Sequence, residues 1–251
     1  MSKNIHTPYS FPSGIFITGT DTNVGKTVLT TALSLALQEQ GIQVGLMKPV
    51  ETGRSPSFQD SDSARLRHSL QPNTPPPIRN SYQFPDPIAP LSASKRIQQS
   101  IDLDRIKTHY EEIRGKCEII LVEGAGGVLV PLTDQFNVRD LIAFLELPTI
   151  IVTKNTLGAV NHTLLTIEAL RRKDIPILAI MLNQSTPLTG KEIEKIQMDS
   201  TTQLIREYSG IQVFGPLLFS PLIQNHWEKG ILEITQDTEI RKLVKFLRKT
   251  S

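Results

Sequence analysis

The sequence predicts a single α/β domain, built on a mostly parallel β-sheet with helices on both faces. Short runs that are apolar throughout, such as 119–122 and 149–152, alternate with longer segments of helical periodicity. Fully apolar strands are typical of a parallel sheet that is covered on both faces. The 251 residues suffice for one sizeable core and are marginal for two. One domain over 14–251 is therefore expected.

The elements of this domain alternate regularly along the chain. Residues 1–13 are polar, contain two prolines and are expected to form a flexible N-terminal arm. Strands are expected at 14–18, 44–47, 119–122, 149–152, 177–182 and 213–214. Helices are expected at 27–40, 102–115, 138–145, 160–172, 191–208 and 239–248.

Residues 54–100 interrupt this alternation. Prolines are dense in this segment, and proline disfavours long regular elements. We expect an insertion over the ligand side of the sheet, with one short helix near 62–70.

Composition excludes several classes of function. The chain has 27 basic and 25 acidic side chains, so its formal net charge of +2 is too small to recruit nucleic acid or anionic lipid unaided. The single cysteine, Cys117, rules out a disulfide framework. No apolar stretch is long enough to span a bilayer, and a cytoplasmic protein is expected.

The strongest motif is the segment Gly-Thr-Asp-Thr-Asn-Val-Gly-Lys-Thr at 19–27, between the first strand and the first helix. Such a loop directs backbone N–H groups at phosphate oxygens, and here Lys26 would neutralise the β- and γ-phosphates while the Thr27 hydroxyl would bind Mg²⁺. Five residues separate Gly19 from Gly25, one more than usual. A chance Gly-Lys-Thr is the alternative, but the strand–loop–helix context favours a P-loop NTPase fold.

Three further side chains are candidates for the same site. Glu123 ends an apolar strand, where a carboxylate facing Thr27 would complete an oxygen shell for Mg²⁺. Asp62 could join it or could simply cap a short helix. Lys48 follows the second strand, at the sheet edge where ligands bind, although an ordinary solvated lysine is the alternative.

Together these segments resemble the dethiobiotin synthetases. The matches are 19–27, Lys-Pro-Val at 48–50, Ser-Asp at 61–62, Val-Glu-Gly-Ala-Gly-Gly at 122–127 and Leu-Gly-Ala-Val-Asn-His at 157–162. The resemblance implies Mg²⁺ at Thr27, Asp62 and Glu123. It also implies ATP contacts from Asn23, Val24, Gly25, Lys26, Thr27, Val28, Asp62, Glu123, Gly124, Ala125, Gly126, Asn183 and Gln184.

The resemblance also implies a reaction. An amine of 7,8-diaminononanoate captures CO₂ as a carbamate, ATP phosphorylates the carbamate, and the second amine closes the ring to dethiobiotin with release of ADP and phosphate. Lys48, Lys26 and Thr52 are then the expected catalytic residues. Thr52, Gly158, Ala159 and Asn161 are expected to bind the substrate, whose tail would cross a homodimer interface to the last three. Helix capping is the alternative role for this last segment.

Two departures from the family pattern concern residues that would contact the adenine base of ATP. The family usually has Asn-Asp where this chain has Asn183-Gln184, and its Pro-aromatic pair has no clear equivalent in 215–221. ATP is expected, and a looser nucleotide preference stays open.

Three other functions compete with this one. A partner-regulated switch ATPase of the division or partitioning type would carry a lysine where this chain has Asp21. Its support is the basic amphipathic segment 239–249, which could lie on a membrane or could close the sheet. A GTPase would need an aspartate that 153–156 lacks. A non-catalytic nucleotide-binding module would bind ATP without turnover.

Overall fold

A parallel six-stranded sheet forms the centre of the molecule, with strand order β2-β5-β1-β6-β7-β8. The structure is a computed structural model that describes residues 11–53, 61–68 and 79–249. The strands are β1 (Gly14–Gly19), β2 (Val44–Met47), β5 (Ile119–Gly127), β6 (Thr149–Lys154), β7 (Ile177–Asn183) and β8 (Val213–Leu217). The predicted parallel sheet is confirmed, and β5 and β8 run further than expected.

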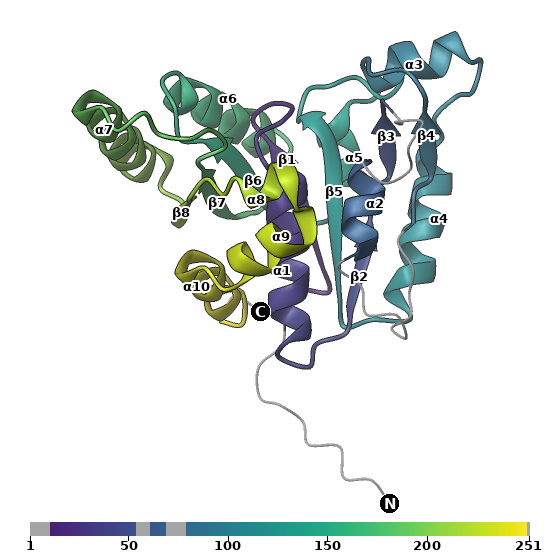
Figure 1. Cartoon of the computed structure of the whole chain (residues 1–251). Coiled ribbons are helices and arrows are strands. Elements are labelled where there is room, and N and C mark those ends of the chain that lie inside the picture. The colour runs from purple at the N-terminus through teal and green to yellow at the C-terminus, as the bar shows by residue number, and fades with distance from the viewer. Residues whose placement is uncertain (1–10, 54–60, 69–78, 250–251) are drawn as a thin grey trace, which may run out of the picture.

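Helices cover both faces of this sheet (Figure 1). On one face lie α1 (Lys26–Gln38), α2 (Asp62–His68), α9 (Trp227–Thr235) and α10 (Thr238–Leu247), which share one buried cluster. On the other lie α4 (Leu103–Arg114), α5 (Val138–Phe144), α6 (Ala159–Arg171) and α7 (Glu192–Ser209). The predicted α/β class with two covered faces is therefore correct.

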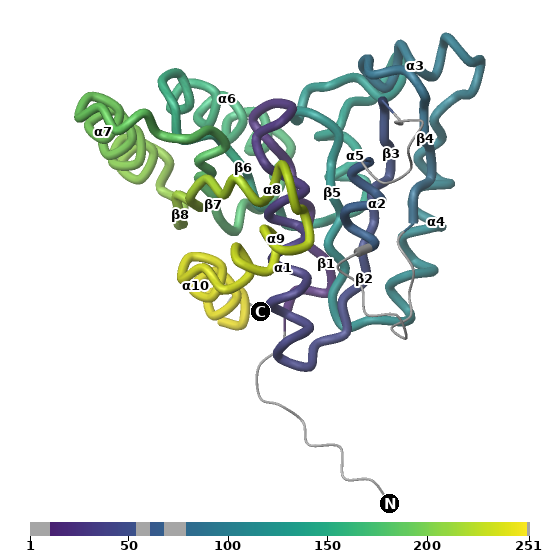
Figure 2. The backbone as a smooth tube through the Cα atoms, in the orientation of Figure 1, coloured from purple at the N-terminus to yellow at the C-terminus, as the bar shows by residue number. Residues whose placement is uncertain are grey.

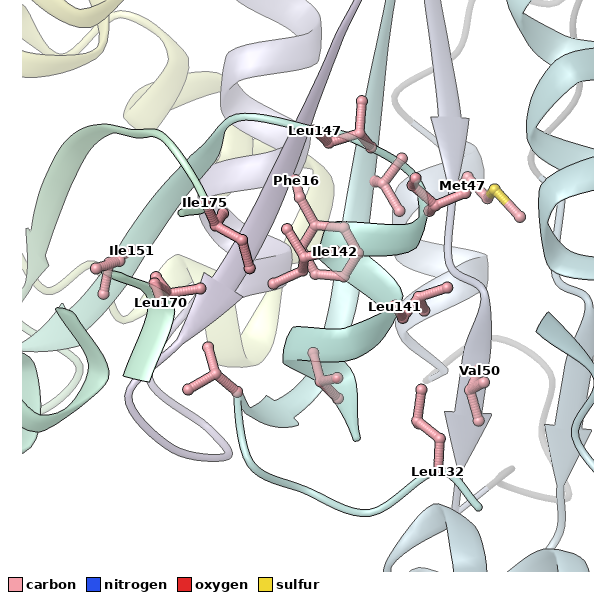
Figure 3. Close-up of a cluster of buried hydrophobic side chains, with 14 of the residues drawn as sticks. Phe16, Met47, Val50, Leu132, Leu141, Ile142, Leu147, Ile151, Leu170 and Ile175 are labelled. Atoms are coloured by element: carbon pink, nitrogen blue, oxygen red, sulfur yellow. The ribbon is translucent and has the colours of Figure 1, made fainter. Parts of the chain in front are cut away.

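Each face of the sheet has its own apolar core. Phe16 on β1 is fully buried against α5, where Leu141 and Ile142 pack around it (Figure 3). Ile15 and Ile17 alternate to the opposite face, under Leu33 of α1. Burial of each such side chain stabilises the fold by about 1.5–3 kcal/mol. Because β1 is buried on both sides, the loop that follows it starts from a rigid strand.

The segment expected as an insertion contains more regular structure than predicted. The short helix is confirmed as α2. The segment also contains β4 (Tyr82–Phe84), which pairs in parallel with β3 (Val50–Thr52) just before the segment, and α3 (Pro90–Arg96). Proline at the first position of α3 is compatible with a helix, because that N–H has no partner anyway. Residues 54–60 and 69–78 lie outside the described part of the chain, as do 1–10 of the expected arm.

The C-terminal part adds two helices that the sequence did not predict, α8 (Leu222–Asn225) and α9. In the smooth trace α9 lies beside α1, although it is far from it in sequence, and α8 packs against α9 (Figure 2). In α10 the apolar stripe of Ile240, Leu243, Val244 and Leu247 is buried. The stripe therefore packs inside the fold, and the closing-helix interpretation is confirmed. No helix within the described ranges is long and apolar enough to cross a membrane.

Candidate nucleotide-binding site

The loop between β1 and α1 has the backbone of a phosphate loop. Gly25 has φ of +103° and Asn23 has φ of +52°, so the chain turns through left-handed conformations before α1 begins. A Cβ at Gly25 would overlap the side-chain amide of Asn183. The first N–H groups of α1 have no partners within the helix and are suited to an anion. The predicted strand–loop–helix context is confirmed.

Lys26 is held inside this loop. Its Nζ donates a hydrogen bond of 2.8 Å to the backbone oxygen of Asp21, and the residue is only 7% exposed. Burial, helped by the positive charge of Lys48, lowers the pKa of Lys26 to about 8. A phosphate group would stabilise the charged form of this amine, so the site favours an anionic ligand.

Lys48, Asp62, Glu123 and Thr27 meet in one cluster beside the loop. Lys48 Nζ lies 2.6 Å from Asp62 Oδ2 and 2.5 Å from Glu123 Oε1. The Thr27 hydroxyl lies 2.9 Å from Asp62 Oδ1 and 2.8 Å from Glu123 Oε1. Four elements supply these groups, since Lys48 follows β2, Asp62 begins α2, Glu123 lies in β5 and Thr27 lies in α1. These four candidates from separate motifs thus converge.

Burial and mutual charge shift the pKa values of the ionisable groups in this cluster. Burial opposes the charge on Lys48, but the carboxylates of Glu123 and Asp62 outweigh burial and raise its pKa well above the usual value. Burial likewise acts to raise the pKa of Asp62, but Lys48 and the Thr27 hydroxyl outweigh it and lower that pKa to about 2. Burial raises the pKa of Glu123, and Lys48 offsets part of this rise. The Lys48 ammonium therefore favours the ionised form of both Asp62 and Glu123.

The oxygen atoms of this cluster fit a magnesium ion bound together with phosphates. Thr27, Asp62 and Glu123 offer only hard oxygen donors, and Oε2 of Glu123 is buried without a hydrogen-bond partner in the described chain. Among the described residues, no three His, Cys, Asp or Glu side chains come together as a metal site of their own. Mg²⁺ often takes one or two carboxylates and completes its shell with phosphate and water, so the donor set fits.

Asp62 is positioned by a buried network that the sequence analysis did not identify. Glu51 on β3 is 4% exposed, and its Oε1 accepts the backbone N–H of Ser63 at 3.1 Å. Its Oε2 accepts the Ser63 hydroxyl, and the amides of Asn80 and Gln83 lie 3.4 and 3.3 Å from the same oxygen. The first turn of α2 is therefore tied to β3. The sequence analysis selected Lys48, Thr52 and Asp62 around this network but gave Glu51 no role.

A cavity of about 230 Å³ extends from the phosphate loop. Asn23, Gly25, Lys26, Thr27, Val28 and Asp62 line its loop end. Asn183 and Gln184 line it at the end of β7, and Asn183 also donates to the Val24 oxygen at 2.9 Å. Further lining comes from Ser185, from 218–220 with the aromatic Phe219, and from α8 and α9 with the aromatic Trp227. Arg65 of α2 lines it too. Sequence reasoning missed Arg65 and Trp227, since neither lies in a motif.

Gly124, Ala125 and Gly126 continue β5 beyond Glu123 and do not line this cavity. A Cβ at Gly124 would lie 2.8 Å from the Phe16 ring, so the strand can pass there only without a side chain. This glycine accordingly has a packing reason. Direct nucleotide contact by the three residues stays a prediction.

The expected substrate residues lie away from this cavity within one chain. Thr52 ends β3 and is partly buried. Gly158 caps α6 with φ of +88°, Ala159 begins the helix, and Asn161 is exposed. A row of hydroxyls connects α6 to the phosphate loop, because Thr153 lies 3.2 Å from Thr20 and 3.1 Å from Thr163.

Fold and site together define a P-loop nucleotide-binding protein. Residues 13–226 match the family model described as an AAA domain. ATP-dependent dethiobiotin synthetase BioD of Methanococcus vannielii is 37% identical over 202 residues, which are 80% of this chain and 91% of that protein. The enzyme of the same name from Bacillus thuringiensis is 36% identical over 241 residues, 95% of this chain and 96% of that protein. The chain belongs to the family of ATP-dependent dethiobiotin synthetases.

Similarity to solved structures concerns the fold. The cell division protein MinD of Aquifex aeolicus superposes with a TM-score of 0.58 at 15% identity, covering 94% of this chain and 95% of that one. At this identity the likeness shows a shared P-loop architecture alone. The switch ATPases therefore share the fold of this chain, whereas the sequence relatives named above are dethiobiotin synthetases.

Proposed function

We propose that this protein is an ATP-dependent dethiobiotin synthetase, which carboxylates 7,8-diaminononanoate with CO₂ and closes the ring to dethiobiotin. The observation that carries the proposal is the meeting of Lys48, Asp62 and Glu123 with Thr27 beside the phosphate loop. The relatives named above are ATP-dependent dethiobiotin synthetases, which supplies the nucleotide and the product of the proposed reaction. The natural place for this reaction is the cytoplasm, where ATP and Mg²⁺ are available.

The reaction brings two anions together. An amine of the substrate adds to CO₂ with loss of a proton, giving a carbamate. A carbamate oxygen attacks the γ-phosphorus of ATP, ADP leaves, and a carbamic–phosphoric anhydride forms. The second amine attacks the carbonyl carbon, the ring closes, and phosphate leaves with the shared oxygen while the amine loses its proton. Repulsion between carbamate and γ-phosphate is the main electrostatic obstacle.

The two buried lysines are placed to reduce that obstacle. Lys26 is within the loop that would hold the β- and γ-phosphates, and Lys48 lies beside it, near enough for their charges to interact. Magnesium, held by Thr27, Asp62 and Glu123, would neutralise phosphate charge. Fixing the reacting groups in one orientation supplies the rest of the acceleration, and Thr52 at the end of β3 is our candidate for orienting the diamine.

The tail carboxylate of the substrate would bind to a second copy of the chain. Gly158, Ala159 and Asn161 lie at the N-terminus of α6, whose free N–H groups suit a carboxylate. Leu157, just before α6, and Leu165, within it, are 83% and 57% exposed and add apolar surface that a second copy would cover. These observations favour a homodimer with the substrate between subunits.

Omission of single components tests the proposal. ATP consumption is measured with 7,8-diaminononanoate, bicarbonate and Mg²⁺, and each is left out in turn. We expect consumption only in the complete mixture. Turnover that ignores the diamine but responds to phospholipid vesicles would favour the switch ATPase. Binding of ATP without turnover in any mixture would favour a non-catalytic module.

A further inference from the structure

Two side chains outside every motif meet at the nucleotide cavity. The guanidinium carbon of Arg65, on α2, lies 4.8 Å from the centre of the Trp227 ring, on α9. This is the geometry of a cation–π contact. Both residues line the cavity that begins at Lys26 of the phosphate loop. The contact therefore joins α2 and α9 where both border that cavity.

Arg65 shares its helix with a residue of the phosphate end. Asp62 lies three positions earlier, and side chains three apart are neighbours on a helix surface. α2 is held in place, since Leu66 is fully buried and Ser63 is bonded to Glu51. Because this helix is fixed, Arg65 presents a permanent positive charge to the same cavity as Lys26.

Trp227 belongs to the other end of the cavity. With its phosphates on the loop, a nucleotide would place its nucleoside in the part of the cavity lined by Gln184, Phe219 and Trp227. The indole packs against the apolar core on one side. Its Nε1–H is buried and has no acceptor within the described ranges, so this donor is available to a ligand.

We propose that Arg65 and Trp227 form a clamp on the bound nucleotide. The indole supplies a wall for the nucleoside, the guanidinium binds the phosphate chain, and their mutual contact holds both in place. The inference deepens the proposed function and rests on it for the identity of the nucleotide as ATP. The edge of the indole, with its N–H unpaired among the described residues, is not shaped for one particular base, so the clamp contributes affinity more than base selection.

The test uses a property of the chain itself, since Trp227 is its single tryptophan. Intrinsic fluorescence of the full chain is titrated with MgATP, with magnesium tripolyphosphate and with adenosine, and calorimetry gives the dissociation constants. We expect a saturable change in emission with MgATP, at a midpoint that matches calorimetry. The change with tripolyphosphate alone should be smaller, because no nucleoside reaches the indole.

Variants separate the clamp from general effects of charge. We expect Arg65→Ala to weaken ATP binding roughly tenfold and to raise KM for ATP, with kcat within about twofold. Arg65→Lys should recover part of this loss, because it keeps the charge without the planar group. The matched control is Arg67→Ala on the exposed side of the same helix, which should bind ATP like the parent protein.

The outcomes distinguish the clamp from the proposed reaction. Calorimetric binding of MgATP with unchanged tryptophan emission would overturn the clamp, even if the diamine-dependent reaction proceeds. Equal ATP affinity in Arg65→Ala and Arg67→Ala would also overturn it. A change in emission together with weaker binding in Arg65→Ala supports the clamp even in a protein that fails to consume ATP with the diamine.

Discussion

Lys48 Nζ lies 2.5 Å from Oε1 of Glu123, a carboxylate with no solvent exposure. The sheet register explains this contact. Met47 and Val122 are paired across β2 and β5, so the residue that follows each one emerges at the same edge of the sheet. Two candidates 75 positions apart in the chain thereby become an ion pair.

Replacement of Lys48 by alanine should abolish turnover while most ATP affinity remains. The loop residues that bind the phosphates stay in place, but the carbamate and the γ-phosphate lose a neutralising charge. We also expect a lower free energy of unfolding, by about 3–5 kcal/mol, because Glu123 would be buried without its cation. Diamine-dependent ATP consumption, calorimetry with MgATP and urea unfolding measure the three quantities. Lys116→Ala, at an exposed position, is the control. Full turnover in Lys48→Ala would remove the role assigned to this lysine.

Asp62→Asn should weaken the magnesium dependence of the site. The substitution keeps the shape of the side chain but removes a charged oxygen donor, so we expect roughly tenfold more Mg²⁺ at half-maximal ATP consumption. Asp174→Asn is a matched control at an exposed position with φ of +53°, a conformation that asparagine also tolerates. Identical magnesium curves for the two variants would argue against Asp62 as a ligand.

Glu51→Ala should disturb Asp62 from a distance. Loss of the carboxylate leaves the Ser63 N–H and the Asn80 amide without this acceptor, which costs about 1–3 kcal/mol of stability. We expect a raised magnesium requirement in the folded variant as well, since the first turn of α2 is no longer fixed. Glu51→Gln retains an oxygen acceptor and should restore part of both properties. A stability loss with an unchanged magnesium curve would limit Glu51 to a structural role.

Acid should reduce the contribution of Glu239 to stability. Burial acts to raise the pKa of this carboxyl, but the Lys242 ammonium and the Gly215 N–H outweigh burial and hold the pKa below its usual value. A lowered pKa in the folded state stabilises the protein above the pKa of the unfolded chain, and this stabilisation disappears as pH falls through the folded pKa. Glu239→Gln should therefore cost about 1 kcal/mol in urea unfolding at pH 7 and progressively less in acid. A difference that stays constant with pH would contradict this assignment.

Residues with a local signal were the ones that the sequence could predict. Gly25, Lys26 and Thr27 form a motif whose backbone conformation is local, and Lys48 and Glu123 each directly follow a recognisable apolar run. Regular helices and strands were found for the same reason, since hydrophobic periodicity is a property of short segments.

Features that depend on tertiary contacts could not be predicted in this way. Trp227 reaches the cavity because α9 folds back beside α1, and nothing around this tryptophan in sequence indicates that path. Glu51 acquires its role only through its hydrogen bond with Ser63, on the first turn of α2, which the sequence does not show. The strands β3 and β4 are three residues each, too short for a clear alternation of apolar and polar positions.

The central claim is that a nucleotide on the phosphate loop drives ring closure of a diamine with CO₂. Its most direct test is mass spectrometry of the product formed from 7,8-diaminononanoate, MgATP and ¹³C-bicarbonate. The account predicts dethiobiotin that carries one ¹³C atom, formed in equal amount to the phosphate released. Phosphate release without a labelled ring product would contradict it.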